Sequence, residues 1–124
     1  MSNYIIKINR GDSFEFDLII PKKDDLKQNH ILDENSAIYF AIMYPYQRFE
    51  DALFLKGFNH EDQDKETGII KVKLLPNDTR KIEPGIYYYT VKLQKGGTLD
   101  IIDDLDEPDE VRTIIERTKF IINE

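Results

Sequence analysis

The chain has 124 residues, and its 40% hydrophobic and 33% charged residues are typical of one folded globular domain rather than of a disordered chain. It has no cysteine, which excludes disulfides, zinc–thiolate sites and thiol catalysis, and no apolar run approaches the ~20 residues of a membrane span. The net charge of −7 comes with no basic patch, so we expect neither a nucleic-acid nor a membrane partner. The expected organisation is a single domain over residues 1–124.

Alternation of apolar and polar residues dominates the chain and predicts about seven β-strands. In the second of them, Phe14, Phe16 and Leu18 point to one face while Glu15 and Asp17 point to the other, the pattern of a half-buried strand. In chain order, the expected strands cover residues 4–8, 13–20, 37–44, 53–58, 70–74, 86–93 and 113–122. This number and spacing of strands predicts an all-β fold, namely an immunoglobulin-like antiparallel β-sandwich.

Three details of the strands and connections refine this prediction. The segment 37–44 (AIYFAIMY) is apolar on both faces, which is typical of a central strand, and Pro45 ends it. Residues 45–55 hold one helical turn at most, residues 76–79 form a turn or a helical turn, and a phase shift of the apolar pattern near Arg117 indicates a β-bulge. The expected core consists of Phe14, Phe16, Leu18, Phe40, Ile70, Val72, Leu74, Tyr87, Tyr89 and Val91.

A Pro84-Gly85 turn leads into the aromatic strand and defines a structural corner with the tyrosines that follow it. In immunoglobulin-like sandwiches, a tyrosine at this corner hydrogen-bonds to the backbone a few residues upstream. The apolar phase of the strand places Tyr87 and Tyr89 in the core, whereas the spacing from Pro84 nominates Tyr88 for the corner. Both assignments remain open from the sequence.

These motifs occur in an order that is found in a known family. A Gly-Asp turn is followed by Ser13-Phe14-x-Phe16-x-Leu18, then Gly68-x-Ile70-x-Val72-x-Leu74, Asn77-Asp78-Thr79 and Gly85-x-Tyr87-x-Tyr89-x-Val91. Over residues 5–93 the chain resembles the small immunoglobulin-like virion domains of tailed bacteriophages and prophages, including the N-terminal domain of baseplate upper proteins. One departure is Thr90, because that family often has an acidic residue after its second tyrosine.

The resemblance implies a non-enzymatic structural component of a tailed phage or prophage particle, as a baseplate, neck, tail or capsid accessory protein. Such a component is made in the bacterial host cytoplasm, is located in the virion, and docks onto other virion proteins or onto itself. For self-association the expected site is the edge of the C-terminal strand, residues 113–122, whose apolar residues fall on both faces. The charged side chains of Glu116, Arg117 and Lys119 oppose such pairing.

An aromatic cluster lies where the central strand ends, in the segment YPYQRF. Tyr44, Tyr46 and Phe49 form a possible interaction patch, because aromatic side chains bring a large contact area at a small entropic cost. The alternative function is therefore a binding module that recognises a host-surface carbohydrate or protein through this patch. The alternative role of the three rings is to cover the open end of the sandwich.

One acidic segment carries the net charge of the chain. Residues 100–110 contain seven acidic residues and no basic one, and the rest of the chain is charge-balanced. The segment is expected to be a solvated loop; the alternatives are a Ca²⁺ site and a contact with a basic partner. It lacks the order of acidic residues and glycine that an EF-hand loop has.

No residue pattern in the chain points to an enzyme. His30 and His60 stand 30 residues apart in polar stretches, and we expect both to be exposed loop residues. No serine-nucleophile motif and no phosphate-binding glycine loop is present in the sequence. We therefore assign no catalytic, cofactor-binding or metal-ligating residue.

Overall fold

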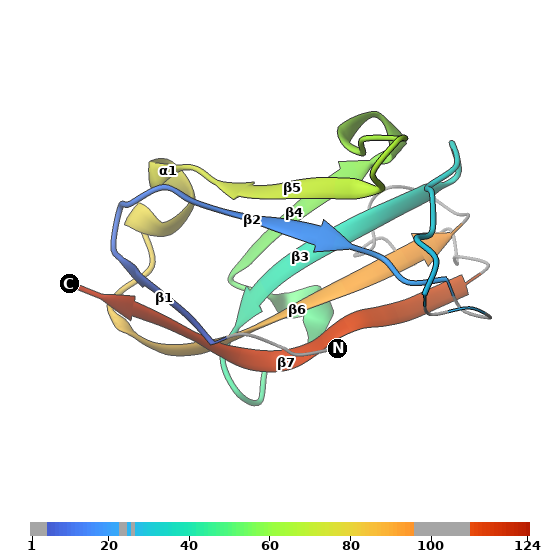
Figure 1. Ribbon diagram of the computed structural model, residues 1–124. Helices are drawn as coiled ribbons and strands as arrows, with labels where there is room; N and C mark the ends of the chain where they lie inside the picture. The colour runs from blue at the N-terminus through green and yellow to red at the C-terminus, as the bar shows by residue number, and fades with distance from the viewer. Residues whose placement is uncertain (1–4, 23–24, 26, 96–109) are drawn as a thin grey trace.

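Two β-sheets face each other across a core in the computed structural model, which describes residues 5–22, 25, 27–95 and 110–124 (Figure 1). The five-stranded sheet has the order β1-β7-β6-β3-β4, and the second sheet pairs β2 with β5. The strands are β1 (Ile6–Asn9), β2 (Phe14–Ile19), β3 (Ser36–Met43), β4 (Phe54–Asn59), β5 (Ile69–Leu74), β6 (Gly85–Lys95) and β7 (Glu110–Asn123). The helical elements are α1 (Pro76–Arg80) and two 3₁₀ turns, Phe49–Asp51 and His60–Asp62.

This architecture confirms the predicted all-β sandwich. The strands divide as β2 and β5 on one sheet and β3, β6 and β7 on the other, which is the division that an immunoglobulin-like sandwich has. The helical turns predicted within residues 45–55 and 76–79 are present as the first 3₁₀ turn and as α1. Within the described part of the chain, no helix combines the length and the apolar composition that a membrane crossing requires.

The expectation of a purely antiparallel sandwich is wrong for one pair of strands. β1 runs parallel to β7, with Ile6 opposite Phe120 and Asn9 opposite Asn123. After β1, the chain turns at Gly11, whose φ of +84° favours glycine, and crosses to the other sheet instead of returning as a hairpin. Because β1 thus pairs with the last strand and not with the next one, no tight turn forces it to be antiparallel.

Phe40, at the middle of β3, lies at the centre of the core between the sheets. Its ring is 6.0 Å from that of Phe16, 5.7 Å from Tyr89, 6.3 Å from Phe120 and 6.5 Å from Phe54, measured between ring centroids. Offset and edge-on contacts of this kind add to the stabilisation that burial alone provides. Of the predicted core, the following residues are buried: Leu18, Phe40, Ile70, Val72, Leu74, Tyr87, Tyr89 and Val91.

Two predicted core residues, Phe14 and Phe16, are only partly buried. Both lie on β2, and in the two-stranded sheet β2 pairs only with β5. The rings of these phenylalanines pack against the core, but the open edge of β2 leaves them partly accessible to solvent. The alternation along the strand is therefore correct, while the depth of burial depends on the width of the sheet.

The bulge predicted near Arg117 is confirmed. Tyr89 of β6 lies opposite Thr118 of β7, and Val91 lies opposite Ile115, so β7 carries one extra residue between these pairs. The end of β7, from Phe120 onward, also pairs with β1. The strand edge expected to mediate self-association is therefore occupied over this last part, which leaves only the earlier part of β7 for such pairing.

Candidate functional site

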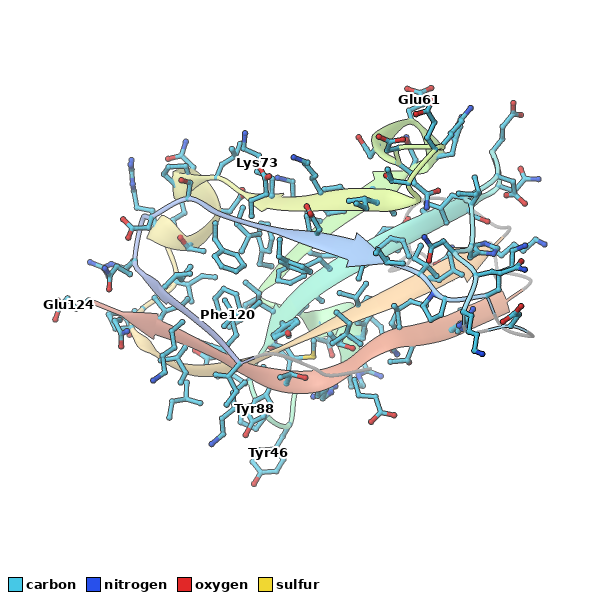
Figure 2. All side chains as sticks on the ribbon, in the orientation of Figure 1. Tyr46, Glu61, Lys73, Tyr88, Phe120 and Glu124 are labelled. Carbon is cyan, nitrogen blue, oxygen red and sulfur yellow. The ribbon has the colours of Figure 1, made fainter. Side chains whose placement is uncertain are left out.

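The three residues of the predicted aromatic patch have different environments. The side chain of Tyr46 is 99% exposed and projects away from the sandwich (Figure 2), and Tyr44 is 51% exposed. Phe49 is only 7% exposed, so the expectation that all three rings lie at the surface is wrong for this residue. What remains at the surface is the turn that follows β3, residues 44–47, which we call the Tyr46 turn.

Phe49 is buried because β3 is apolar on both faces. Its inward residues enter the core between the sheets, whereas Ala37, Tyr39, Ala41 and Met43 form a second cluster with Phe49 on the outer face of the five-stranded sheet. The 3₁₀ turn Phe49–Asp51 brings the phenylalanine ring back over this face. The all-apolar segment 37–44 indicates that another segment must shield the outer face of β3 from solvent. It does not identify which segment does so.

Backbone and side-chain hydrogen bonds hold the Tyr46 turn in one conformation. Arg117 of β7 donates from Nη1 to the Pro45 carbonyl at 3.1 Å and from Nη2 to the Gln47 carbonyl at 2.5 Å. The Gln47 side chain accepts from the Tyr44 N–H at 3.1 Å, and the Gln47 N–H donates to the Tyr44 carbonyl at 3.1 Å. The turn therefore presents the exposed Tyr46 ring on a backbone that is fixed from both ends.

Arg117 lies on the outer face of β7, next to the bulge. Two successive residues of β7, Glu116 and Arg117, both line the outer face, which regular alternation would not allow. The Thr90 hydroxyl of β6 donates to the Ile115 carbonyl at 2.6 Å beside the bulge. Thr90, the departure from the family pattern, thus provides a partner for a buried backbone group.

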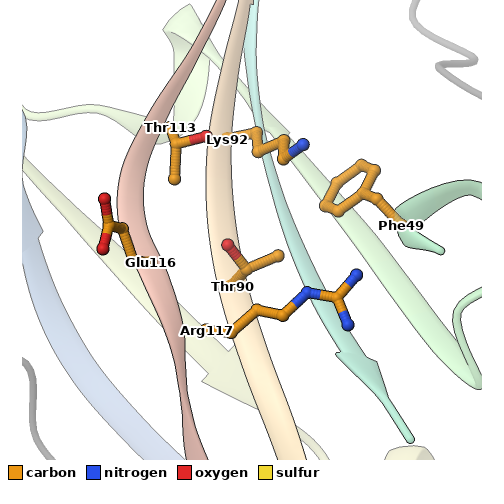
Figure 3. A pocket seen from close by; sticks show the side chains of 6 residues that line it. All are labelled: Phe49, Thr90, Lys92, Thr113, Glu116 and Arg117. Atoms are coloured by element: carbon orange, nitrogen blue, oxygen red, sulfur yellow. The ribbon is translucent and has the colours of Figure 1, made fainter. Parts of the chain in front are cut away.

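Beside the Tyr46 turn, the outer face has a hollow of about 250 Å³ (Figure 3). In Figure 3, the ammonium group of Lys92 lies beside Phe49, with Lys92 Nζ 4.9 Å from the centroid of its ring. The terminal nitrogens of Arg117 are directed at the carbonyls of the Tyr46 turn. In this view the Glu116 carboxylate projects from the edge of β7 that is farther from Lys92 and Arg117. The hollow is lined by Phe49, Thr90, Lys92, Thr113, Glu116 and Arg117.

At one end of the sandwich, the structure identifies the tyrosine of the corner. The Tyr87 hydroxyl donates to the Glu83 carbonyl, four residues upstream, and the ring is buried. The assignment of Tyr87 and Tyr89 to the core is thus confirmed, and the spacing argument for Tyr88 is wrong because Tyr88 lies on the opposite face of β6. Burial raises the pKa of Tyr87 above its ordinary value, and the neighbouring Tyr44 and Glu83 raise it further.

A second hollow, of about 390 Å³, lies next to this corner, and Tyr44 at the start of the Tyr46 turn also lines it. Its aromatic wall is formed by Tyr44 and Tyr87, whose ring centroids are 5.5 Å apart. We call it the corner groove, and it is lined by Tyr44, Leu53, Phe54, Asn77, Asp78, Lys81, Ile82, Glu83 and Tyr87. It combines an apolar floor with polar groups, the usual composition of a ligand site.

The other predicted features give no site in the described residues. Among residues 5–22, 25, 27–95 and 110–124, no three histidine or acidic side chains gather in a way that would hold a metal ion. The acidic segment 100–110 lies outside the described residues except for the position of Glu110 at the start of β7, so its Ca²⁺ alternative remains a prediction.

Sequence reasoning missed Gln47 and Arg117, which support the Tyr46 turn, and Lys92, which lines the hollow beside it. The predicted bulge was a usable signal for Arg117, because bulges often redirect a side chain, whereas nothing marked Lys92. Comparison with protein-family models, with curated proteins and with solved structures finds no match for this chain. The functional argument therefore rests on its own residues and their geometry.

Proposed function

We propose that the chain is a non-enzymatic structural component of a tailed phage or prophage particle, and that it docks onto other virion proteins through the Tyr46 turn. The observation that carries the docking role is a 99% exposed tyrosine on a turn that Arg117 and Gln47 hold in place. An exposed aromatic ring on a fixed backbone binds with little loss of conformational entropy. Tyrosine is also among the residues that contribute most to protein–protein contacts.

The virion setting is supported by the resemblance of residues 5–93 to small phage domains. The residues that carry it, from Phe14 to Val91, occupy the strands, the short helix α1 and the tyrosine corner of the sandwich. These positions determine how the fold is built, and the resemblance assigns the setting in which such a fold is used. The docking surface itself is a property of this chain, because the Tyr46 turn lies outside those motifs.

The test is incorporation into particles. In a strain whose prophage encodes the chain, mass spectrometry of purified, salt-washed particles is expected to find it in a fixed ratio to the major virion proteins. Tyr46→Ala is expected to lower that ratio at least tenfold, whereas the control Ile19→Ala, which removes an exposed apolar side chain from β2, leaves it unchanged. Particles that lack the wild-type chain, or that incorporate both variants equally, would refute the proposal.

The corner groove favours a second candidate function, the binding of a host-surface carbohydrate. The half-exposed Tyr44 ring offers a stacking surface, and Asn77, Lys81 and Glu83 offer hydrogen-bonding groups at the same hollow. Its volume of about 390 Å³ is within the range of ligand pockets. Retention on purified cell-wall polysaccharide that Tyr44→Ala abolishes and Tyr46→Ala preserves would support this function over docking by the turn.

A further inference from the structure

In the described part of the chain, the hollow beside the Tyr46 turn is lined by two basic side chains and one acidic side chain, so it carries an excess of positive charge. The side chains of Lys92 and Arg117 both line this hollow, Lys92 beside the Phe49 ring and Arg117 beside the Tyr46 turn (Figure 3). Glu116 is the acidic residue that lines the hollow, and in Figure 3 it projects from the edge of β7 that is farther from Lys92 and Arg117. Because the formal net charge of the chain is −7, this local excess of positive charge is opposite in sign to the protein as a whole.

The two cations retain donors for a further acceptor. Among the described residues, the hydrogen bonds of Arg117 to Pro45 and Gln47 use two of the five N–H groups of a guanidinium. The ammonium of Lys92 carries three donors, and its contact with Phe49 is made with the face of a ring. With a volume of about 250 Å³, the hollow has room for a side-chain carboxylate.

We propose that this hollow binds a carboxylate side chain of the docked virion partner, an inference that rests on the proposed docking function. The partner then has an acidic residue next to a surface that receives the Tyr46 ring. Long-range repulsion from a chain of net charge −7 disfavours acidic partners in general, whereas the hollow attracts a carboxylate at one position. The carboxylate therefore fixes the orientation of the partner, while Tyr46 provides the contact area.

Arg117 connects the two parts of this surface. The same guanidinium that holds the Tyr46 turn lines the hollow, so a carboxylate bound there contacts the group that fixes the turn. Among the residues that the structure describes, the hydrogen bonds that hold the turn come from Arg117 and Gln47 and not from Lys92, so substituting Lys92 changes the hollow without removing the support of the turn. Lys92 is therefore the informative position for a variant.

The experiment is an NMR titration of the full chain with a synthetic peptide that contains four glutamates, compared with its glutamine counterpart. The glutamate peptide is expected to shift the amide signals of Thr113 and Lys92 and the Arg117 Nε signal in a saturable way, and to bind more weakly as NaCl rises from 50 to 300 mM. Lys92→Gln is expected to weaken binding about tenfold, the effect of one charge-assisted hydrogen bond. Lys92→Arg retains binding, and so does the control Lys71→Gln on β5, on the other sheet.

The outcomes separate this inference from the docking function. Equal shifts with the glutamine peptide, or unchanged affinity in Lys92→Gln with a normal melting curve, would overturn the carboxylate site. In the particle assay, normal incorporation of Lys92→Gln together with loss of Tyr46→Ala would reject the carboxylate site and leave docking in place. Normal incorporation of Tyr46→Ala would reject docking itself, whatever the peptide does.

Discussion

The two faces of the five-stranded sheet are built differently, although β3 supplies apolar residues to both. On the inner face, Phe40 is enclosed by aromatic rings from several strands, and the second sheet closes the layer. On the outer face, the smaller cluster around Ala41 and Met43 is covered by Phe49 from a single short turn. The comparison indicates that the inner face provides most of the stability, while a single short segment next to the Tyr46 turn covers the outer face.

The largest effect is expected from the inner face. Phe40→Ala removes a fully buried ring with four aromatic neighbours and should lower the free energy of unfolding by about 3–5 kcal/mol. Urea unfolding followed by circular dichroism measures this loss. Phe16→Ala, at the open edge of β2, is the control and should cost about half as much, because its ring is only partly buried. Equal losses for the two variants would contradict the description of β2 as an open edge.

A smaller, local effect is expected from the outer face. Phe49→Ala removes the cover of the second cluster and should cost about 2 kcal/mol, below the usual value for a central core ring. Hydrogen exchange should show the Gln47 amide, which donates to the Tyr44 carbonyl, exchanging faster, while the amide of Val91 in β6 stays protected. Faster exchange throughout β6 would mean that the two faces are not independent.

The same comparison explains how far the sequence predicts the structure. Alternation identified the strands, because one face of each strand is buried, and the apolar segment 37–44 correctly indicated a central strand. Alternation does not state which distant segment covers an outer face, so Phe49 was grouped with its sequence neighbours Tyr44 and Tyr46 and expected at the surface. The parallel direction of β1 was missed for a related reason, since pairing between the first and last strands leaves no local signal.

The candidate site was predicted in part. The exposed Tyr46 was predicted because three aromatic residues cluster where the central strand ends, whereas its support by Arg117 joins residues about 70 positions apart. For the corner tyrosine, the sequence identified the strand but not the residue. Spacing from Pro84 favoured Tyr88, whereas alternation placed Tyr87 and Tyr89 toward the core. Only the hydrogen bond from Tyr87 to the Glu83 carbonyl decides between them.

The third prediction concerns the hydrogen bond of Tyr87 at this corner, whose loss should lower the free energy of unfolding by less than any ring deletion above. Tyr87→Phe keeps the ring but removes its hydrogen bond to the Glu83 carbonyl, so it should cost about 1 kcal/mol in urea unfolding at pH 7. Tyr88→Phe, on the other face of the same strand, is the control and should leave stability unchanged. A similar loss in both variants would indicate that the corner bond makes no particular contribution.

The raised pKa of Tyr87 also predicts how the stability difference depends on pH. Above pH ~10, the tyrosine ionises in the unfolded chain while the folded chain still holds the proton. The unfolded state then binds fewer protons, so the stability that Tyr87 contributes is present below this pH and is lost as the pH rises through the folded-state pKa. Urea unfolding of the wild type should therefore weaken above pH ~10 more steeply than that of Tyr87→Phe, and parallel curves would contradict this.

The smallest effect is expected from the acidic segment, residues 100–110, and it tests whether stability comes from the two apolar faces rather than from charge. Replacing Asp103, Asp104, Asp106 and Asp109 with Asn should change the free energy of unfolding by no more than about 0.5 kcal/mol, as is usual for solvated positions. Removal of like charges could only favour the folded state slightly. Millimolar Ca²⁺ should leave the melting temperature of the wild type unchanged, because an ion stabilises a protein only where it binds the folded state. A Ca²⁺-dependent rise in melting temperature that the Asn variant abolishes would instead establish a metal site in this segment.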